Sequence, residues 1–337
     1  MPLSLHIPVV EQSQEGEARR LATAWATEQG LGRDEVAKVA LVVSELARNL
    51  AIHTGEGGHL LLSAVENAPR QIEVISIDRG PGAANFTLFL RDGFSTAGTA
   101  GTGLGAVRRA STTFDFHSQE GFGSVLVSRL GGEASAAEPR FCLGAVNVPK
   151  KGEVLCGDAY AMEYLDGGRV RLLVADGLGH GPLAAEASGL AAQIFRSHLE
   201  VDLPSLLEKM DRAMRATRGA AVAIAEVRPS QGQVFYAGVG NIAGHILGLD
   251  RPVHMVSQNG TVGASIRRVQ GFTYPWSSDS IVVMNSDGLK TQWQLDRYTG
   301  LAEKHPSLIS GILFRDFNRG TDDSTVATLR FANEHRI

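Results

Sequence analysis

The chain has 337 residues, of which 43% are hydrophobic, and a formal net charge of -4 at pH 7. That length accommodates two domains that each bury a core, and the sequence has no basic block of the kind a nucleic-acid surface needs to neutralise phosphates. The two cysteines, Cys142 and Cys156, have neither a zinc nor a CxxC spacing, which is typical of a reducing cytosol. No signal-like start or apolar run of about 20 residues is present, so we expect a soluble cytoplasmic protein without a membrane or nucleic-acid partner.

The N-terminal stretch predicts a strand followed by two helices. Residues 3–9 alternate as a strand does, and residues 15–29 have apolar residues at helical spacing, with Gly30 as a stop. The second helix is predicted to have Asp34 as its N-cap and to extend to about residue 50, because its apolar residues recur with a period near 3.6.

Polar residues on the second helix are followed by a glycine-containing strand end. Glu45 and Asn49 are four residues apart and share a helix face. Residues 60–65 and 71–77 predict two paired strands, and the second ends in DRGPG, residues 78–82. Its glycines let the backbone approach a ligand closely, while the aspartate offers a fixed acceptor.

A glycine-rich segment, residues 93–105, then leads into a predicted helix over residues 106–110. Free N–H groups and the positive end of the helix dipole at such a junction favour phosphate. The segment lacks the lysine of a P-loop, and no strand directly precedes it as in a Rossmann unit, so it does not identify a nucleotide site by itself.

Taken together, the runs SELARN, DRGPG and GTGLGAVRR stand in the order of the N, G1 and G2 boxes of the GHKL ATPases. The runs SELARNL, GTGLGAVRRAST and FDFHSQEGFGSVLVSRL further resemble the RsbT-type serine/threonine switch kinases, over about residues 1–130. The resemblance implies ATP and Mg²⁺ as cofactors, with Asn49 holding the ion. It implies that Glu45 orients or deprotonates the acceptor hydroxyl and that Asp78 accepts a hydrogen bond from the adenine amino group. The remaining nucleotide contacts implied are Gly80 and Gly82 at the adenine and Gly101, Thr102, Gly103, Leu104 and Gly105 over the phosphates.

The second half begins after a short stretch of small and polar residues, GGEASAAEP, which is typical of a linker. Strands are predicted at residues 141–148 and 153–160, and helices at residues 183–199 and 203–217. The Ala- and Leu-rich faces of these helices are expected in the core.

Aspartates in this half lie next to strand ends. The apolar run 172–174 ends at Asp176-Gly177, and the apolar run 281–284 leads to Asp287-Gly288. Further acidic residues at such positions are Asp158, Asp322 and Asp323. Aspartates that converge from strand ends supply the oxygen ligands that Mg²⁺ and Mn²⁺ prefer, as a metal-dependent hydrolase requires.

The motifs GDAY, DGLGHG, RGAAVAIAEV, AGVGNI, SDGL and GTDDSTV resemble, in this order, the SpoIIE/RsbX branch of the protein phosphatase 2C (PPM) family, from about Pro139 onward. The resemblance implies a β-sandwich flanked by helices and two Mn²⁺ or Mg²⁺ ions whose bridging water attacks phosphoserine or phosphothreonine. It gives Asp176 a catalytic role, and His180 is either a proton donor or a residue that only stabilises the turn. The implied metal ligands are Asp158, Asp176, the Gly177 carbonyl, Asp287 and either Asp322 or Asp323.

We therefore expect an α+β fold with a GHKL (Bergerat) ATPase α/β sandwich at residues 1–131, a linker at 132–139 and a protein phosphatase 2C-like αββα sandwich at 140–337. The leading hypothesis is a bifunctional partner-switching regulator that phosphorylates a STAS-domain protein and dephosphorylates such proteins, in a stressosome or sigma-factor control module. Two alternatives are kept. The N-terminal half binds ATP only to sequester a partner, as an anti-sigma factor does, or it senses nucleotide and regulates the phosphatase. A homodimer is left open.

Overall fold

The computed structural model describes residues 4–84, 86, 103–132, 140–264, 266 and 268–332. These residues form two compact units. The N-terminal unit takes in the described residues up to 132 together with Gln294–Arg315, and the C-terminal unit takes in those from 140 to 293 and from 316 to 332. The units thus differ from the division expected from the sequence at one segment, because residues 294–315 pack with the N-terminal unit. The expected linker lies almost entirely outside the described residues.

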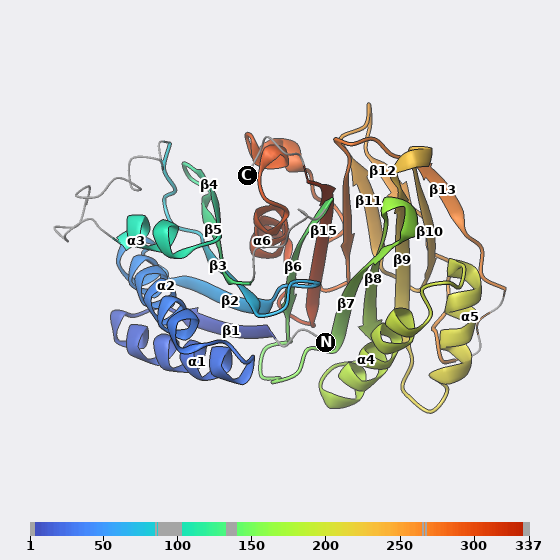
Figure 1. Cartoon of the computed structure of the whole chain (residues 1–337), viewed down its shortest axis with the longest axis horizontal. Helices are drawn as coiled ribbons and strands as arrows, with labels where there is room; N and C mark the ends of the chain where they lie inside the picture. The colour runs from blue at the N-terminus through green and yellow to red at the C-terminus, as the bar shows by residue number, and fades with distance from the viewer. Residues whose placement is uncertain are drawn as a thin grey trace. The chain divides into compact units, whose positions relative to one another are not determined.

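The N-terminal unit contains a five-stranded antiparallel sheet in the order β1-β2-β3-β5-β4 (Figure 1). A short 3-10 turn, η1 (Gln12–Gln14), precedes the helices. The helices are α1 (Glu15–Glu28), α2 (Arg33–His53) and α3 (Gly103–Ala110), and the strands are β1 (Ser4–Val9), β2 (Gly58–Ala64), β3 (Gln71–Asp78), β4 (Thr113–Gln119) and β5 (Gly123–Gly131). The apolar stripes of α1 and α2 pack against one face of the sheet, as their period predicted.

Two helix starts differ from the prediction. The N-cap of α2 is Gly32, not Asp34, and the Gly32 N–H donates a hydrogen bond to the Glu35 carboxylate over 2.8 Å. The side chain at the third helical position thus satisfies the N–H group of the N-cap residue itself. Helix α3 begins at Gly103, three residues before its predicted start.

The other face of this sheet packs against a helix that the sequence analysis did not predict. Helix α6 (Pro306–Phe317) follows two 3-10 turns, η5 (Leu295–Arg297) and η6 (Leu301–Glu303). A Cβ built on Gly311 of α6 would lie 2.8 Å from Val125 Cγ1 and 3.5 Å from Ile75 Cγ2. Because side chains alternate along a strand, Val125 and Ile75 lie on the face opposite the α1 and α2 core.

The C-terminal unit is a sandwich of two five-stranded antiparallel sheets. The first sandwich sheet has the order β13-β10-β9-β8-β7 and the second has β12-β11-β14-β15-β6. Strands of the first are β7 (Asp158–Leu165), β8 (Arg169–Gly177), β9 (Ala220–Arg228), β10 (Gln233–Val239) and β13 (Phe272–Pro275). Strands of the second are β6 (Phe141–Val148), β11 (Ala243–Leu247), β12 (Val253–Met255), β14 (Ile281–Asn285) and β15 (Ser324–Phe331).

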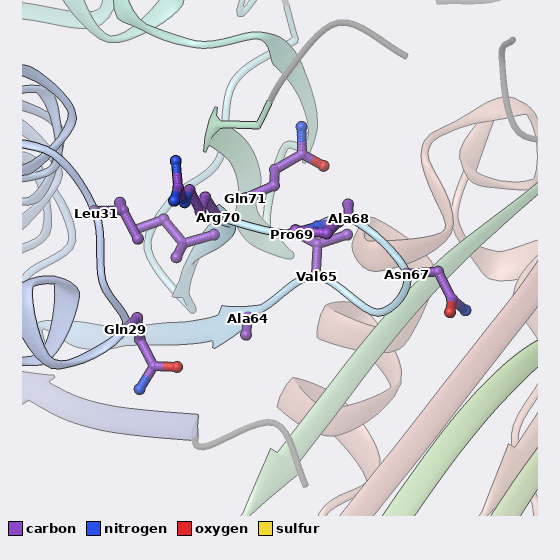
Figure 2. Close-up of a pocket in the computed structure, with 10 residues that line it drawn as sticks. Gln29, Leu31, Ala64, Val65, Asn67, Ala68, Pro69, Arg70 and Gln71 are labelled. Carbon is purple, nitrogen blue, oxygen red and sulfur yellow. The ribbon is translucent and has the colours of Figure 1, made fainter. Parts of the chain in front are cut away.

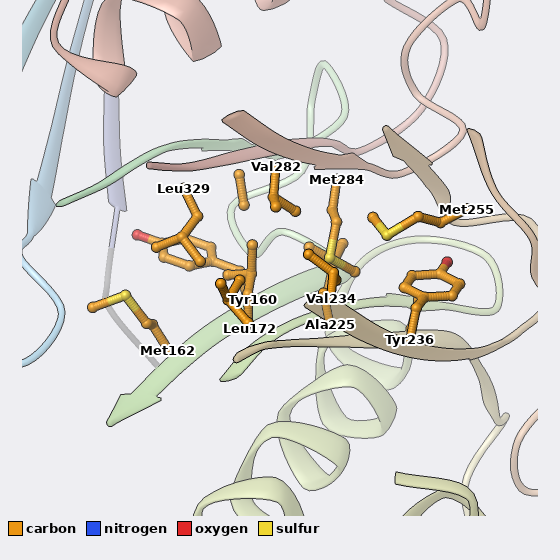
Figure 3. Close-up of a cluster of buried hydrophobic side chains, with 14 of the residues drawn as sticks. Tyr160, Met162, Leu172, Ala225, Val234, Tyr236, Met255, Val282, Met284 and Leu329 are labelled. Atoms are coloured by element: carbon orange, nitrogen blue, oxygen red, sulfur yellow. The ribbon is translucent and has the colours of Figure 1, made fainter. Parts of the chain in front are cut away.

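Apolar side chains from both sheets fill the interior of the sandwich (Figure 3). Tyr160 and Leu172 from the first sheet and Val282 and Leu329 from the second belong to this core. Helices α4 (Pro182–Ser197) and α5 (Leu203–Ala213) cover the outer face of the first sheet, with 3-10 turns η3 (Asp166–Gly168) and η4 (Pro229–Gln231) between strands. The predicted α+β class is confirmed.

Two elements in this unit have a bound that differs from the prediction by more than two residues. β7 begins at Asp158 rather than at residue 153, and α5 ends at Ala213 rather than at residue 217. Among the helices of the described residues, none combines the length and the hydropathy needed to cross a bilayer.

Candidate functional site

The first candidate site is a cluster of carboxylates where β7 begins and β8 ends. Asp158, the first residue of β7, is paired in register with Asp176 of β8. The Gly177 N–H donates to the Gly157 carbonyl oxygen over 3.1 Å and holds the two strand ends together. The two carboxyl groups therefore stand next to each other at one edge of the first sandwich sheet.

Ser286 joins this pair to the second sandwich sheet, whose strand ends carry the other aspartates. The Ser286 hydroxyl donates to Asp158 Oδ2 over 2.6 Å, and it accepts a hydrogen bond from the Thr325 N–H over 2.9 Å. These bonds fix the end of β14 and the start of β15 against β7. Asp287 directly follows Ser286, and Asp322 and Asp323 directly precede β15.

Burial and mutual repulsion raise the pKa values of the paired carboxyls. Asp158 is 1% exposed, and burial followed by the charge of Asp176 raises its pKa well above the ordinary value. Burial, then the charges of Asp287 and Asp322, raise the pKa of Asp176 to about 7. The charge of Asp323 also raises both pKa values, so the charges of five aspartates from separate motifs act on one another.

Asp323 is held by the backbone at the same place. Its Oδ1 accepts the Lys150 N–H over 2.8 Å, whereas its buried Oδ2 has no hydrogen-bond partner among the described residues. Burial is also the main cause of the raised pKa of Asp323. Asp322 Oδ1 accepts the Asp323 N–H over 3.0 Å. Asp322 therefore bonds to its own neighbour in the chain, whereas Asp323 bonds to the distant Lys150.

Close packing leaves room only for glycine beside the aspartates. A Cβ on Gly177 would lie 2.1 Å from the Ala184 carbonyl oxygen, and one on Gly157 would lie 2.5 Å from Asp323 Oδ2. Because only glycine fits at position 177, the end of β8 packs directly against the first turn of α4. Asp287 Oδ2 accepts the Asn241 amide over 2.7 Å, a partner that the sequence analysis did not single out although it lies in the AGVGNI motif.

His180 contacts a carboxylate outside this cluster. Its Nδ1 lies 2.7 Å from Glu153 Oε1, and both side chains are partly exposed. Glu153 was not identified from the sequence, because nothing in its local pattern marks it. The pair links the segment before β7 to the turn after β8, which supports the positioning alternative for His180 without testing the proton-donor alternative.

The donor chemistry of the cluster fits a hard divalent cation. Its members are carboxylate and carbonyl oxygens, and Asp323 Oδ2 is a buried acceptor without a partner. In the described part of the chain, no group of three or more His, Cys, Asp or Glu side chains is arranged so that it could hold a metal ion by itself. Mg²⁺ is usually held by one or two carboxylates and several waters, so such a group is not required.

The second candidate site surrounds Asp78 at the end of β3. Asp78 Oδ1 accepts the N–H groups of Gly80 and Ser124 over 2.8 and 3.1 Å. Burial raises the pKa of Asp78, and these two hydrogen bonds oppose the increase. Gly82 has a φ of +66°, and a Cβ there would lie 2.0 Å from the Gln119 carbonyl oxygen. The carboxylate is therefore fixed beside a backbone that only glycine can form.

Segment 294–315 reaches this same strand end. The Arg315 guanidinium lies 3.4 Å from the Asp78 backbone oxygen, and the Arg79 guanidinium donates to the Arg315 backbone oxygen. Arg315 is 5% exposed. The sequence offered no signal for this contact, because more than 200 residues separate its two sides.

Glu45 faces the start of α3. A Cβ on Gly103 would lie 2.5 Å from Glu45 Oε2, so the α2 carboxylate adjoins the first residue of α3. Arg48 approaches Glu45 within 3.4 Å and Glu15 within 3.1 Å. Asn49 is half-buried one turn along α2.

Of the other predicted nucleotide contacts, Leu104 and Gly105 lie in the first turn of α3, where Leu104 packs against the core. Gly101 and Thr102 lie outside the described residues.

A depression of about 290 Å³ lies at the opposite end of β3, where residues 64–72 meet Gln29 and Leu31 (Figure 2). It lies away from Asp78, and none of its lining residues was a predicted site residue.

Two families match successive parts of the chain. Residues 10–129 match the histidine kinase-like ATPase domain, and residues 166–332 match Stage II sporulation protein E (SpoIIE). Both matches agree with the two resemblances stated from the motifs.

Two curated relatives come from Bacillus subtilis (strain 168). The serine/threonine-protein kinase RsbT is 34% identical over 107 residues, which cover 32% of this chain and 80% of RsbT. The phosphoserine phosphatase RsbX is 36% identical over 93 residues, which cover 28% of this chain and 46% of RsbX. The chain therefore matches most of the first relative and less than half of the second.

Solved structures agree on the fold. A chain from a study of the bacterial stressosome, described as a modular system adapted to control secondary messenger signaling, matches 56% of this chain and 99% of its own length, with a TM-score of 0.53 and 26% identity. RsbX in complex with magnesium matches 59% of this chain and 99% of its own length, with a TM-score of 0.51 and 22% identity.

Proposed function

Because the chain belongs to the RsbT-like family of histidine kinase-like ATPases and carries a SpoIIE-type protein phosphatase 2C domain in the same polypeptide, we propose that it is a bifunctional partner-switching enzyme. Its C-terminal unit removes phosphate from serine or threonine of a STAS-domain protein. Its N-terminal unit phosphorylates such a protein with ATP. The observation that carries the phosphatase half is the convergence of aspartates from both sandwich sheets, with the pKa of Asp176 raised to about 7.

In the phosphatase reaction, Asp158, Asp176, the Gly177 carbonyl and Asp287 would hold two Mg²⁺ or Mn²⁺ ions, with Asp322 or Asp323 completing the set. When bound, such ions lower the pKa of a coordinated water and stabilise charge on phosphoryl oxygens. The chain's own contribution is to fix the ligands. Ser286 orients the Asp158 carboxylate, and Asn241 orients that of Asp287.

In the kinase reaction, Asp78 would accept the adenine amino group, and Gly80 and Gly82 would leave space for the ring. Asn49 would hold Mg²⁺ against the phosphates, and residues 101–105 would cover them. Glu45 would orient or deprotonate the acceptor hydroxyl. Arg48 holds Glu45 on the α2 surface, which favours an orienting role. Positioning of this kind supplies most of the rate in phosphoryl transfer.

Intact-mass measurements on a STAS-domain protein test both activities. The chain should remove phosphate from the phosphorylated form with added Mn²⁺ or Mg²⁺, and EDTA should stop it. For the kinase, the Asp176→Asn variant is used so that newly added phosphate is not removed. Transfer from ATP-Mg should appear with this variant and disappear in the Asn49→Ala, Asp176→Asn double variant. No transfer by the single variant would leave the sequestering or sensing alternatives for the N-terminal unit.

The contact between Arg315 and the Asp78 strand end favours the nucleotide-sensing alternative as a second function. Along the chain, segment 294–315 is flanked by Asp287 on one side and by Asp322 on the other. An effect of ATP on the phosphatase requires that two states of the chain bind nucleotide with different affinity. Phosphatase rates on a phosphopeptide with and without ATP, in the parent and in Asn49→Ala, decide this. A sensing function predicts that ATP changes only the parent rate.

A further inference from the structure

Exposed apolar side chains gather on two segments that border the carboxylate cluster. Val154 is 91% exposed and Leu155 is 44% exposed on the segment that leads into β7. Leu178 and Leu183, on the turn after β8 and at the start of α4, are 47% and 51% exposed. Single exposed apolar residues are ordinary, whereas several on adjoining segments mark an interaction surface.

The two segments are held against each other. Glu153 and His180 form the 2.7 Å contact between them. Gly157 packs so tightly that a Cβ there would lie 2.9 Å from the Ala184 Cβ. The first segment ends at Asp158 and the second begins after Gly177, so the apolar side chains adjoin the residues proposed to act on phosphate.

On the segment that leads into β9, beside the turn after β8, lies a cation without a side-chain partner among the described residues. Arg218 is exposed, and it makes no ion pair or side-chain hydrogen bond in the part of the chain that the structure describes. Its Nη1 lies 3.0 Å from the position of a Cβ built on Gly179. The Leu178 N–H donates to the Gly219 carbonyl oxygen over 3.0 Å, which fixes the backbone beside Arg218 to this turn.

We propose that Val154, Leu155, Leu178, Leu183 and Arg218, called here the docking rim, bind the phosphorylated segment of the substrate protein. The occupant that fits is a phosphoserine or phosphothreonine with apolar residues on both sides. Apolar flanks cover the exposed Val and Leu side chains, and Arg218 attracts the phosphoryl dianion toward a site that is otherwise rich in carboxylates. The inference rests on the phosphatase activity proposed above and adds to it a substrate preference.

The test uses two phosphoserine peptides of equal length, one with leucine and one with glycine on both sides of the phosphoserine, and p-nitrophenyl phosphate as a substrate without flanks. The parent chain with Mn²⁺ should hydrolyse the leucine peptide with a kcat/KM about tenfold above that of the glycine peptide. The Val154→Ser, Leu183→Ser variant should lose this preference through a raised KM, and its rate on p-nitrophenyl phosphate should stay within about twofold of the parent.

Two further variants sharpen the result. Val256→Ser removes an apolar side chain that is 54% exposed and lies outside the docking rim, so it should keep the preference. Arg218→Gln should raise KM for both peptides, and Arg218→Lys should restore part of the loss.

Three results would overturn the docking rim: no preference in the parent, the same loss in Val256→Ser, or a change in the oligomeric state of the double variant, which would make the rim an interface between copies. A parent that hydrolyses none of the three substrates would instead remove the phosphatase proposal, and the rim with it.

Discussion

The Ser307 hydroxyl donates a 2.8 Å hydrogen bond to Glu73 Oε2, although 234 residues separate the two in the chain. Glu73 also pairs with Arg129 Nε at 2.7 Å, and Glu73 and Ser307 are buried. The three side chains tie segment 294–315 to strands β3 and β5. A buried charge is tolerated only where it is paired and hydrogen-bonded, so each member depends on the others.

Truncation of Ser307 and truncation of Glu73 should destabilise the chain by different amounts. Ser307→Ala should cost about 1 kcal/mol in the free energy of unfolding, because Glu73 keeps Arg129. Glu73→Ala should cost more, up to about 3 kcal/mol, because it removes the carboxylate that pairs with the largely buried Arg129 guanidinium. Urea unfolding measures both. Glu303→Ala, an exposed position in the same segment, is the control, and an equal loss there would contradict this ranking.

A side chain at position 311 should loosen α6. In Gly311→Val the new Cβ would lie 2.8 Å from Val125 Cγ1, closer than van der Waals contact allows. Overpacking of this kind typically costs about 1–3 kcal/mol. Thermal unfolding should show a lowered Tm. Gly16→Ala, in the first turn of α1, places a Cβ no closer than 3.8 Å to its nearest neighbour and should leave Tm unchanged or raise it.

Asp176→Asn should separate activity from folding. Loss of the carboxylate removes a metal ligand, so hydrolysis of a phosphopeptide should fall by orders of magnitude at saturating Mn²⁺. The Tm of the metal-free variant should equal or exceed that of the parent, because the repulsion from Asp287 and Asp322 is relieved. Nucleotide binding at Asp78 should be unaffected. A variant that hydrolyses at the parent rate would refute the two-ion site.

The same cluster predicts a pH dependence for the metal-free protein. The pKa of Asp176 is raised from 3.8 to about 7 in the folded state, so the folded state binds a proton more tightly than the unfolded state does. The contribution of Asp176 to stability is therefore lost as the pH rises from about 4 to about 7. With EDTA present, the parent Tm should decrease over this range more steeply than that of Asp176→Asn. Parallel curves would count against the raised pKa.

A histidine pair in the N-terminal unit predicts the opposite pH dependence, a stability that increases as the pH rises. His6 Nε2 lies 3.0 Å from His59 Nδ1, and burial, followed by the charge of His59, lowers the pKa of His6 to about 4. A lowered histidine pKa gives stability that is present above pH 6.5 and is lost as the pH falls toward 4. His6→Gln should reduce the loss of Tm between pH 7 and pH 5, whereas His53→Gln, at an exposed position of α2, should not.

Nucleotide binding should depend on the backbone at Gly82. Gly82→Ala places a Cβ 2.0 Å from the Gln119 carbonyl oxygen at a φ of +66°, so the loop must move. We expect at least tenfold weaker ATP-Mg binding by titration calorimetry, with a similar loss in Asp78→Asn. Gly121→Ala also has a positive φ but open space around it, and it serves as the control for backbone strain alone. Unchanged affinity in both Gly82→Ala and Asp78→Asn would show that adenine does not bind at this strand end.

The sequence predicted the strand ends at Asp78 and Asp176 because each follows an apolar run that stops at a glycine-containing turn. It did not predict the Ser286 bond to Asp158, since that bond depends on how two sheets meet. Helix α6 was missed for a physical reason. Residues 306–315 are buried on all sides of the helix, including the polar Ser307, Ser310 and Arg315, so no solvent-facing polar side revealed a period of 3.6.

Segment 294–315 also determines how the protein can be divided. A fragment that stops at residue 132 would keep α1 and α2 on one side of its sheet but would lack α6 on the other, leaving Ile75 and Val125 without Gly311 against them. Such a fragment is expected to self-associate. A peptide of residues 294–315 added in trans should keep it monomeric, so the N-terminal unit is best produced as a two-piece complex.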